Sequence, residues 1–264
     1  MKALRKIEAD GRLESAKKAK EFAGQVLRYA VTTGKAERNF VPDLRGALKT
    51  PITKHMAAII KPEEVGKLLL AIDAYEGNPV VYCALRLAAL VFVRPSELRH
   101  AEWSEIDFKK KLWIISAEKM KKDKKRKAEK SEDHIVPLSR QSLEILYYIQ
   151  HYTGDFPYVF PSVKSLKRPM SENTVNVAIR TMGYTKDDMT GHGFRVMAKT
   201  LLEEELEFDT KWIEMQLAHT VKDVHGRAYN RAKYLKQRTE MMQAWANYLD
   251  DLKEKAKARV QAVV

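Results

Sequence analysis

Apolar residues recur at intervals of three and four along most of the chain, which is the periodicity of a helix with one buried face. Near the N-terminus they form a single stripe that consists of Leu13, Ala16, Ala19, Phe22, Val26, Leu27 and Ala30. Gly34 follows four residues later, and glycine commonly ends a helix. The pattern therefore predicts a helix over about residues 13–30 that stops before Gly34.

Proline marks the start of three further predicted helices. Pro62 is followed by two glutamates, and proline with early carboxylates is typical of a helix first turn. A second helix is expected over residues 79–91, and Pro95 opens a third. This arrangement leaves Arg94 immediately outside the third helix.

Two short segments, 112–115 and 134–138, break the helical period and are rich in β-branched and aromatic residues. We interpret them as two strands of an antiparallel ribbon with a lysine-rich loop between them. Helical patterns then return over residues 139–148, 173–182, 194–205, 210–218 and 228–252. The expected fold class is mainly α with a small antiparallel β-sheet.

The net positive charge is distributed unevenly along the chain. Residues 1–50 carry 12 Lys and Arg against 6 Asp and Glu, a net charge of +6 out of +13 for all 264 residues. A basic excess of this size suits a polyanionic partner, because each bound phosphate releases condensed counterions. We expect a short helical DNA-binding segment at residues 1–50, a polar linker at 51–62 and a larger domain at 63–264.

Several protein classes are excluded. Cys83, the single cysteine, lies in an apolar run, so neither a disulfide framework nor a cysteine-based metal site is expected. The first residues lack the apolar core of a secretory signal, and no run reaches the ~18–20 apolar residues that span a bilayer. The sequence contains no glycine-rich phosphate loop. We therefore expect a cytoplasmic protein that has no membrane partner.

Four separated segments carry residue types suited to attack on a phosphodiester. They are Arg94, the box His192-Gly193-Phe194-Arg195, His219 and Tyr229. Guanidinium groups can neutralise phosphate oxygens, histidines can move protons, and a tyrosine hydroxyl can be the nucleophile. No cluster of Asp and Glu has convincing spacing for two magnesium ions, whereas arginine binds phosphate bidentately and stays charged. We therefore expect an arginine clamp and no metal.

Each of these residues, taken alone, has an ordinary explanation. Arg94 would more often be a surface or capping arginine, and His192 and His219 would be partly buried histidines. Tyr229 is one of 11 tyrosines, and Tyr234 lies only five residues further on. The chemical interpretation depends on their joint occurrence in this order.

The order and the neighbours of these residues resemble the tyrosine recombinase family, most closely the integrases of temperate phages, satellite phages and genomic islands. Residues 94–98, Arg-Pro-Ser-Glu-Leu, resemble the family's first arginine box, and residues 192–195 resemble its His-x-x-Arg box. Residues 217–220, Leu-Ala-His-Thr, resemble its Leu-Gly-His box, with alanine in place of the commoner glycine. Tyr229 follows His219 by ten residues, and the resemblance covers roughly residues 60–250.

The resemblance implies a site-specific DNA recombinase, or integrase, that cleaves and rejoins DNA through a 3′-phosphotyrosyl intermediate. Tyr229 would be the nucleophile, Arg94, Arg195, His192 and His219 would be catalytic, and Glu97 would support the site. No metal, nucleotide or other cofactor is expected, because one phosphodiester is exchanged for another of similar energy.

The family also places a catalytic lysine in a β-ribbon turn. Residues 119–127 offer several lysines, and Lys121 matches best because it ends the pattern Ala-Glu-x-Met-Lys. The other basic side chains of this loop are candidates for DNA contacts, namely Lys119, Lys122, Lys124, Lys125 and Arg126.

The expected partner is double-stranded DNA with attachment-type sites, bound by a homotetramer, so that the protein would be associated with the nucleoid. A host DNA-bending protein or an excisionase would be further partners. Relatives commonly add an arm-binding domain and a complete core-binding domain, and residues 1–50 would be part of the latter. Two alternatives stay open: a type IB topoisomerase-like enzyme, and a truncated, catalytically silent DNA-binding remnant.

Overall fold

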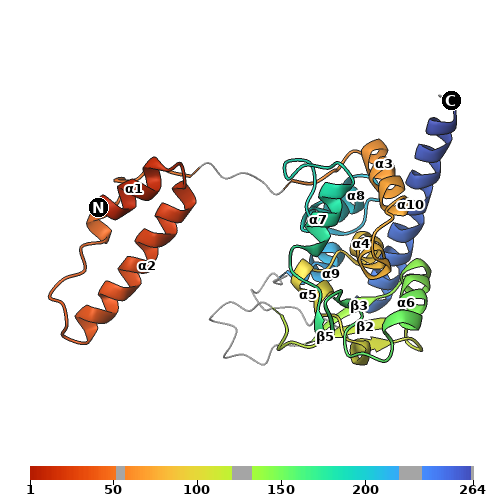
Figure 1. The fold of residues 1–264 in the computed structure, drawn as a ribbon, viewed down its shortest axis with the longest axis horizontal. Helices are drawn as coiled ribbons and strands as arrows, with labels where there is room; N and C mark the ends of the chain where they lie inside the picture. Colours follow the sequence, from red (N-terminus) through yellow and green to blue (C-terminus); the bar gives the residue numbers. More distant parts are fainter. Residues whose placement is uncertain (52–56, 121–132, 220–233, 263–264) are drawn as a thin grey trace. The chain divides into compact units, whose positions relative to one another are not determined.

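The computed structural model describes residues 1–51, 57–120, 133–219 and 234–262. It divides into two compact units, Met1–His55 and Met56–Val264 (Figure 1). The boundary between the units falls inside the segment predicted as a linker.

The first unit is built from two helices, α1 (Lys2–Ala9) and α2 (Leu13–Thr32), and a short 3-10 helix η1 (Pro42–Leu44). The α2 helix confirms the predicted helix and ends just before Gly34, whose φ of 68° is the left-handed conformation that glycine adopts readily. The backbone N–H of Lys49 donates to the Glu8 carboxylate at 2.6 Å, which ties the end of this unit back to α1.

The second unit is mostly helical. Its first three helices each begin at the predicted proline: α3 (Pro62–Asp73), α4 (Pro79–Val91) and α5 (Pro95–Arg99). A short 3-10 helix, η2 (Trp103–Glu105), follows α5. The remaining helices are α6 (Arg140–Thr153), α7 (Thr174–Thr181), α8 (Gly193–Glu204), α9 (Thr210–Gln216) and α10 (Leu235–Gln261).

The predicted ribbon is present as part of a three-stranded antiparallel sheet with the order β1-β2-β3. The strands are β1 (Ile106–Asp107), β2 (Leu112–Ile115) and β3 (His134–Pro137), and Trp113 pairs with Val136. A second hairpin, β4 (Pro161–Ser162) with β5 (Ser165–Pro169), was not predicted. The side chains of β5 are exposed or half-buried without alternation, so the sequence carried no strand signal there.

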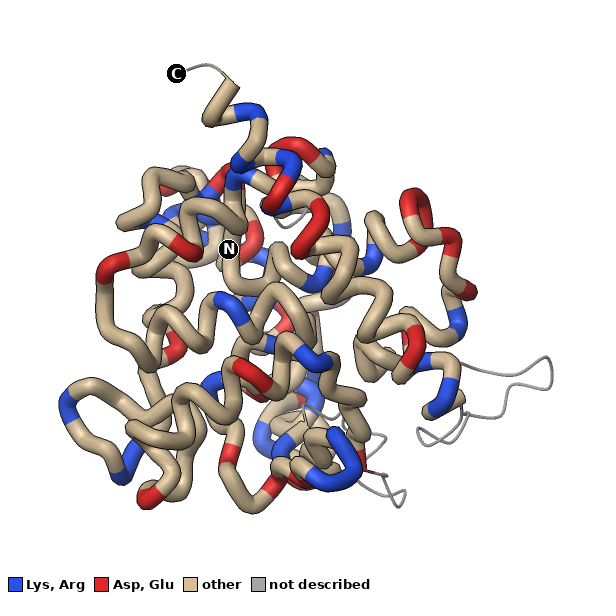
Figure 2. The backbone as a smooth tube through the Cα atoms, turned by 90° about the vertical axis from the view of Figure 1, so that its right-hand side faces the viewer, with Lys and Arg blue, Asp and Glu red and all other residues tan. Residues whose placement is uncertain are grey.

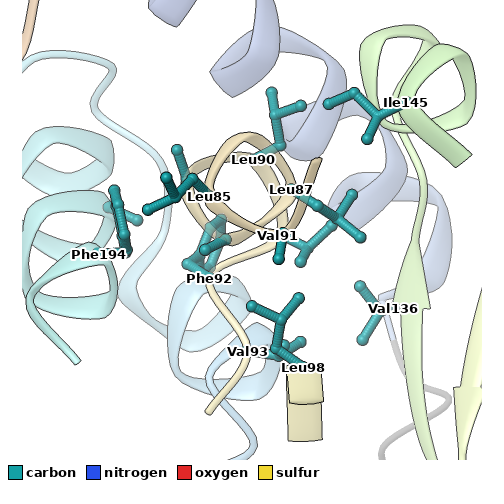
Figure 3. Close-up of a cluster of buried hydrophobic side chains, with 14 of the residues drawn as sticks. Leu85, Leu87, Leu90, Val91, Phe92, Val93, Leu98, Val136, Ile145 and Phe194 are labelled. Carbon is teal, nitrogen blue, oxygen red and sulfur yellow. The ribbon is translucent and has the colours of Figure 1, made fainter. Parts of the chain in front are cut away.

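The α4 helix lies at the centre of the core. Figure 3 shows Leu85 and Phe92 on the side that faces Phe194 of α8, whereas Leu87 and Leu90 face Ile145 of α6. Trp245 of α10 meets the Phe92 ring edge-on, with the ring centroids 6.2 Å apart. This packing fixes Phe92, the residue that caps α4, two positions before Arg94.

The last helix differs from its prediction over residues 228–252. Tyr234 has a φ of 58° and precedes α10, so the helix begins at Leu235, and residues 228–233 lie outside the described part of the chain. At the other end α10 continues to Gln261, because Leu252 and Ala256 are buried where the helix passes close to Gly66 of α3. The mainly helical architecture with small antiparallel sheets confirms the predicted fold class.

Blue and red positions are scattered among uncharged tan positions along the described backbone, and both colours occur in many parts of the tube (Figure 2). Within the described residues, none of the helices combines the length and the apolar character needed to cross a bilayer.

Candidate active site

Arg94 is held by Glu97, three residues ahead of it. The Glu97 carboxylate accepts the Arg94 backbone N–H at 2.8 Å and the side-chain Nη1 at 2.7 Å. Because Arg94 precedes the first turn of α5, this one carboxylate fixes both the helix start and the guanidinium. The Glu97 side chain is only 2% exposed, whereas that of Arg94 is 21% exposed. The guanidinium of Arg94 is therefore partly exposed to solvent, whereas the carboxylate that holds it is buried.

Arg195 lies in the first turn of α8 and is 4% exposed. Its Nη1 donates to the carbonyl oxygen of Phe92 at 2.9 Å, and its Nη2 donates to that of Leu217 at 2.7 Å. Burial, and then the nearby charge of Arg94, lowers the pKa of Arg195 to about 10. The guanidinium is therefore still charged at neutral pH.

The Leu-Ala-His segment forms a helix cap of the Schellman type at the end of α9. The His219 N–H donates to the Glu214 carbonyl oxygen at 2.9 Å, and the Ala218 N–H donates to that of Met215 at 3.0 Å. Ala218 has a φ of 53°, the left-handed conformation at which such caps usually carry glycine. This explains why glycine is the commoner residue at this position in the resembling box.

The carbonyl groups of two left-handed residues contact the two arginines. Phe92, with a φ of 38°, accepts from Arg195, and Ala218 accepts from Arg94 Nη2 at 3.3 Å. A left-handed conformation costs a non-glycine residue roughly 1–2 kcal/mol. Burial of Phe92 and Ala218 holds these turns in place, so that the core fixes the direction of both guanidinium groups.

His219 joins the same cluster. Its Nε2 lies 3.3 Å from Arg195 Nη2, and its Nδ1 lies 2.6 Å from the Glu214 carboxylate. The other Glu214 oxygen accepts Lys199 Nζ at 2.6 Å. The imidazole is therefore contacted from both sides.

His192 precedes the first turn of α8 and is half-buried. Burial, followed by the charges of Arg195, Arg94 and His219, lowers its pKa below the ordinary value. His192 is therefore neutral at neutral pH, which suits an acceptor of protons. The charges of Arg195, Arg94 and His219 are therefore near enough to His192 to affect its protonation.

The structure thus brings together Arg94, Glu97, His192, Arg195 and His219, which come from three parts of the chain far apart in sequence. Some of the predicted site residues lie outside the described residues: Lys121, Lys122, Lys124, Lys125, Arg126 and Tyr229. Within the described ranges, no group of three or more His, Cys, Asp or Glu side chains is close enough to hold a metal ion.

Lys119, predicted to contact DNA, is paired with carboxylates in this structure. Its Nζ lies 2.7 Å from Glu102 and 2.8 Å from Glu105. Burial lowers its pKa, but the hydrogen bonds to the two carboxylates outweigh this effect and raise the pKa above the ordinary value. Lys119 therefore anchors the segment that follows β2 to the η2 helix and its N-cap residue, Glu102.

Sequence reasoning missed two supports around His219. Glu214 contacts His219 directly, and Lys199 contacts Glu214. Neither residue belongs to one of the recognised motifs. It also missed Arg238 of α10, which is buried and donates to Gln216 Oε1 at 2.7 Å and to the Ile135 carbonyl oxygen. Burial lowers the pKa of Arg238 to about 10. This contact joins the end of α9, the sheet and the start of α10.

Comparisons with known proteins agree with this architecture. The family model described as Phage integrase family matches residues 59–236, and the model described as Phage integrase central domain matches residues 1–47. The integrase of Enterobacteria phage P4 is 38% identical over 253 residues, which is 94% of this chain and 57% of the relative. The prophage integrase IntS of Escherichia coli K12 is 33% identical over 252 residues, 95% of this chain and 63% of the relative. The chain therefore spans about three fifths of the length of these relatives.

Solved structures share the fold. A lambda integrase dimer bound to a COC' core site gives a TM-score of 0.60 at 19% identity, covering 88% of this chain and 65% of that one. A lambda integrase tetramer bound to a Holliday junction gives 0.61 at 17% identity, covering 87% and 64%.

Proposed function

The chain belongs to the phage integrase family, and we propose that it is a tyrosine recombinase that breaks and rejoins DNA at specific sites. One observation carries this proposal: Arg94 and Arg195 converge with His192 and His219 although they lie on separate elements. Such a cluster of guanidinium and imidazole groups suits a phosphodiester, whose reaction depends chiefly on positioning and on stabilising negative charge.

The two arginines would bind the non-bridging oxygens of the scissile phosphate. A guanidinium has five N–H donors. The carbonyl groups of Phe92 and Leu217 and the Nε2 atom of His219 take three of those of Arg195, so the group is fixed and still has two donors for a ligand. Arg94 is held by Glu97 and exposes part of its guanidinium. The pair would therefore act as a preformed clamp.

Tyr229 would attack the phosphorus with its phenol oxygen. A bond then forms between phosphorus and this oxygen while the bond to the 5′-oxygen breaks, which leaves a 3′-phosphotyrosyl link. The phenol proton would pass to a neutral imidazole, and His192 is a candidate because its lowered pKa leaves the ring unprotonated at neutral pH. Lys121 would give a proton to the leaving 5′-oxygen. Attack by a 5′-hydroxyl of a partner strand reverses these changes and joins the DNA.

This exchange conserves the number of phosphodiester bonds, so it needs neither a nucleotide nor a redox cofactor. We propose double-stranded DNA with attachment-type sites as the substrate and a homotetramer as the working assembly. The net charge of +13 supports a DNA partner. The DNA-bound dimer and the tetramer on a Holliday junction that lambda integrase forms support the assembly by analogy.

A capture experiment tests the proposal. A library of nicked suicide duplexes with randomised sequence would be incubated with the protein in excess EDTA, and the covalent adducts would be isolated and sequenced. We expect wild-type adducts that share a sequence pattern, no adduct for Tyr229→Phe, and retained adduct for Tyr234→Phe.

The outcomes separate the alternatives. Adducts whose DNA shares no sequence pattern, together with relaxation of supercoiled plasmids, would favour a topoisomerase-like enzyme. DNA binding without any adduct would favour the catalytically silent remnant, and an adduct that requires a divalent metal would contradict the arginine clamp.

A further inference from the structure

The imidazole of His219 has a partner at each ring nitrogen. Nδ1 lies 2.6 Å from Glu214 Oε2, and Nε2 lies 3.3 Å from Arg195 Nη2. The cap at the end of α9 creates this geometry, because the left-handed Ala218 turns His219 back over the last turn, where its N–H meets the Glu214 carbonyl oxygen. The carboxylate and the imidazole are thus brought together by the backbone.

These partners select one tautomer of the neutral ring. A guanidinium nitrogen only donates, so Nε2 accepts from Arg195. A neutral imidazole has a single N–H, which must then be on Nδ1 and donate to the carboxylate of Glu214. An imidazolium would still donate to Glu214 through Nδ1, and its Nε2 would become a donor for a phosphate oxygen. The Glu214 contact is therefore compatible with both states of the ring.

Lys199 of α8 fixes the carboxylate from its other side. Its Nζ lies 2.6 Å from Glu214 Oε1, so each carboxylate oxygen has its own donor. Burial raises the pKa of Glu214, but the hydrogen bonds from Lys199 and His219 outweigh this and lower the pKa below the ordinary value. Glu214 is therefore ionised at neutral pH, and its orientation is set by two elements.

We infer that Glu214, braced by Lys199, is a positioning residue that holds His219 Nδ1–H and directs Nε2 toward Arg195 and the scissile phosphate. A carboxylate that holds a histidine in one tautomer is a recurrent device in catalytic sites. The role in DNA cleavage rests on the proposed function, whereas the contact with His219 is a property of the protein without DNA.

The first test examines the protein without DNA. ¹⁵N-edited NMR of the histidine side chains should find the His219 proton on Nδ1, in a hydrogen bond that slows its exchange with water. Glu214→Leu should lose this protected signal because no acceptor remains. Lys199→Met should retain it, because this change removes only the brace. Glu214→Gln in the Lys199→Met background should also retain it, because the single amide oxygen then has no competing lysine donor.

The second test measures the rate of covalent adduct formation on a captured suicide duplex. We expect Glu214→Leu to lower the rate on the order of 10–100-fold, the usual cost of removing a residue that orients a functional histidine. Glu214→Gln in the Lys199→Met background should restore most of the rate. The control is Glu204→Gln on α8, an exposed carboxylate whose change should leave the rate unaltered. Circular dichroism would verify that each variant is folded.

Two results would overturn the inference. One is a wild-type His219 whose proton lies on Nε2, and the other is a folded Glu214→Leu variant that keeps the protected signal and the wild-type rate. If the NMR result is as expected but no duplex yields an adduct, the proposed function fails while the positioning of His219 stands. If wild type forms the adduct with the proton on Nε2, the inference alone fails.

Discussion

At the scale of single residues, Ala218 adopts a backbone conformation that is unfavourable for its side chain. Its φ of 53° disfavours a Cβ atom, yet its carbonyl oxygen accepts from Arg94. We expect Ala218→Gly to stabilise the protein by up to about 1 kcal/mol, because glycine adopts this conformation without the Cβ penalty. Urea unfolding would measure the change.

The control for this prediction is Ala246→Gly, in the buried interior of α10. There glycine should destabilise the protein by at least about 1 kcal/mol, since helix propensity and packing are both lost. If both substitutions destabilise equally, the conformation of Ala218 carries no strain.

His192 makes stability depend on pH. Its pKa in the folded protein lies below 6.5, so the unfolded chain binds this proton more readily. The free energy of unfolding should therefore be unaffected by this group above pH 6.5 and should fall as pH decreases from 6.5 toward the folded pKa. Urea unfolding between pH 7.5 and 5.5 would measure the loss.

His192→Gln should remove the part of this slope that belongs to His192. The carboxylates act in a separate window, since the lowered pKa of Glu214 makes its contribution disappear only below its ordinary value of 4.5. An unchanged slope in His192→Gln would mean that this histidine does not titrate below its ordinary value.

Some site residues could be recognised from the sequence and others could not. Arg94, Arg195 and His219 each lie in a short segment with characteristic neighbours. Glu214 lies five residues before His219, which is not a spacing that brings side chains together on a regular helix. Only the left-handed turn at Ala218 brings the two side chains together. Alanine rarely adopts this conformation, so the turn could not be predicted from the sequence.

At the scale of elements, helix boundaries were predicted most accurately where a particular residue type, such as proline, favours a helix terminus. Proline fixed the starts of α3, α4 and α5 within a residue, since it lacks the N–H that a first turn does not need. The C-terminal extension of α10 was missed because its buried face is defined by α3, a partner distant in sequence. Likewise β5 pairs with β4 through its backbone and has no buried face of its own.

Two glycines allow close approaches between elements, and their replacement should separate stability from activity. A Cβ at Gly193 would lie 2.5 Å from the Ala57 carbonyl oxygen, and one at Gly66 would lie 2.5 Å from that of Leu252. We expect Gly193→Ala and Gly66→Ala each to destabilise the protein by about 1–3 kcal/mol, because backbone must move.

Only Gly193→Ala should also slow adduct formation, because Gly193 lies between His192 and Arg195 at the start of α8. Gly66→Ala should move α3 away from α10 and leave the site intact. Urea unfolding and adduct rates would be measured for both variants. If both variants form the adduct at the same rate, the backbone position of Gly193 is not important for the site.

At the scale of the whole molecule, the positive charge predicts strong salt dependence. With 48 Lys and Arg against 35 Asp and Glu, DNA binding should release many counterions. A protein that contacts 6–10 phosphates loses roughly 10³–10⁵ in affinity between 50 and 200 mM salt. Fluorescence anisotropy on a labelled duplex in a KCl series would measure the slope, and a nearly flat response would rule out a mainly electrostatic mode of binding.

In the proposed reaction, Tyr229 becomes linked to DNA in a site built from Arg94, Arg195 and His219. The most direct measurement is mass spectrometry of the adduct trapped on a suicide duplex, after digestion of its protein and DNA parts. The expected product is one peptide that carries a nucleotide on Tyr229. A nucleotide on Tyr234 or on any other residue would contradict the proposed reaction, as would the absence of an adduct from protein that binds the same duplex.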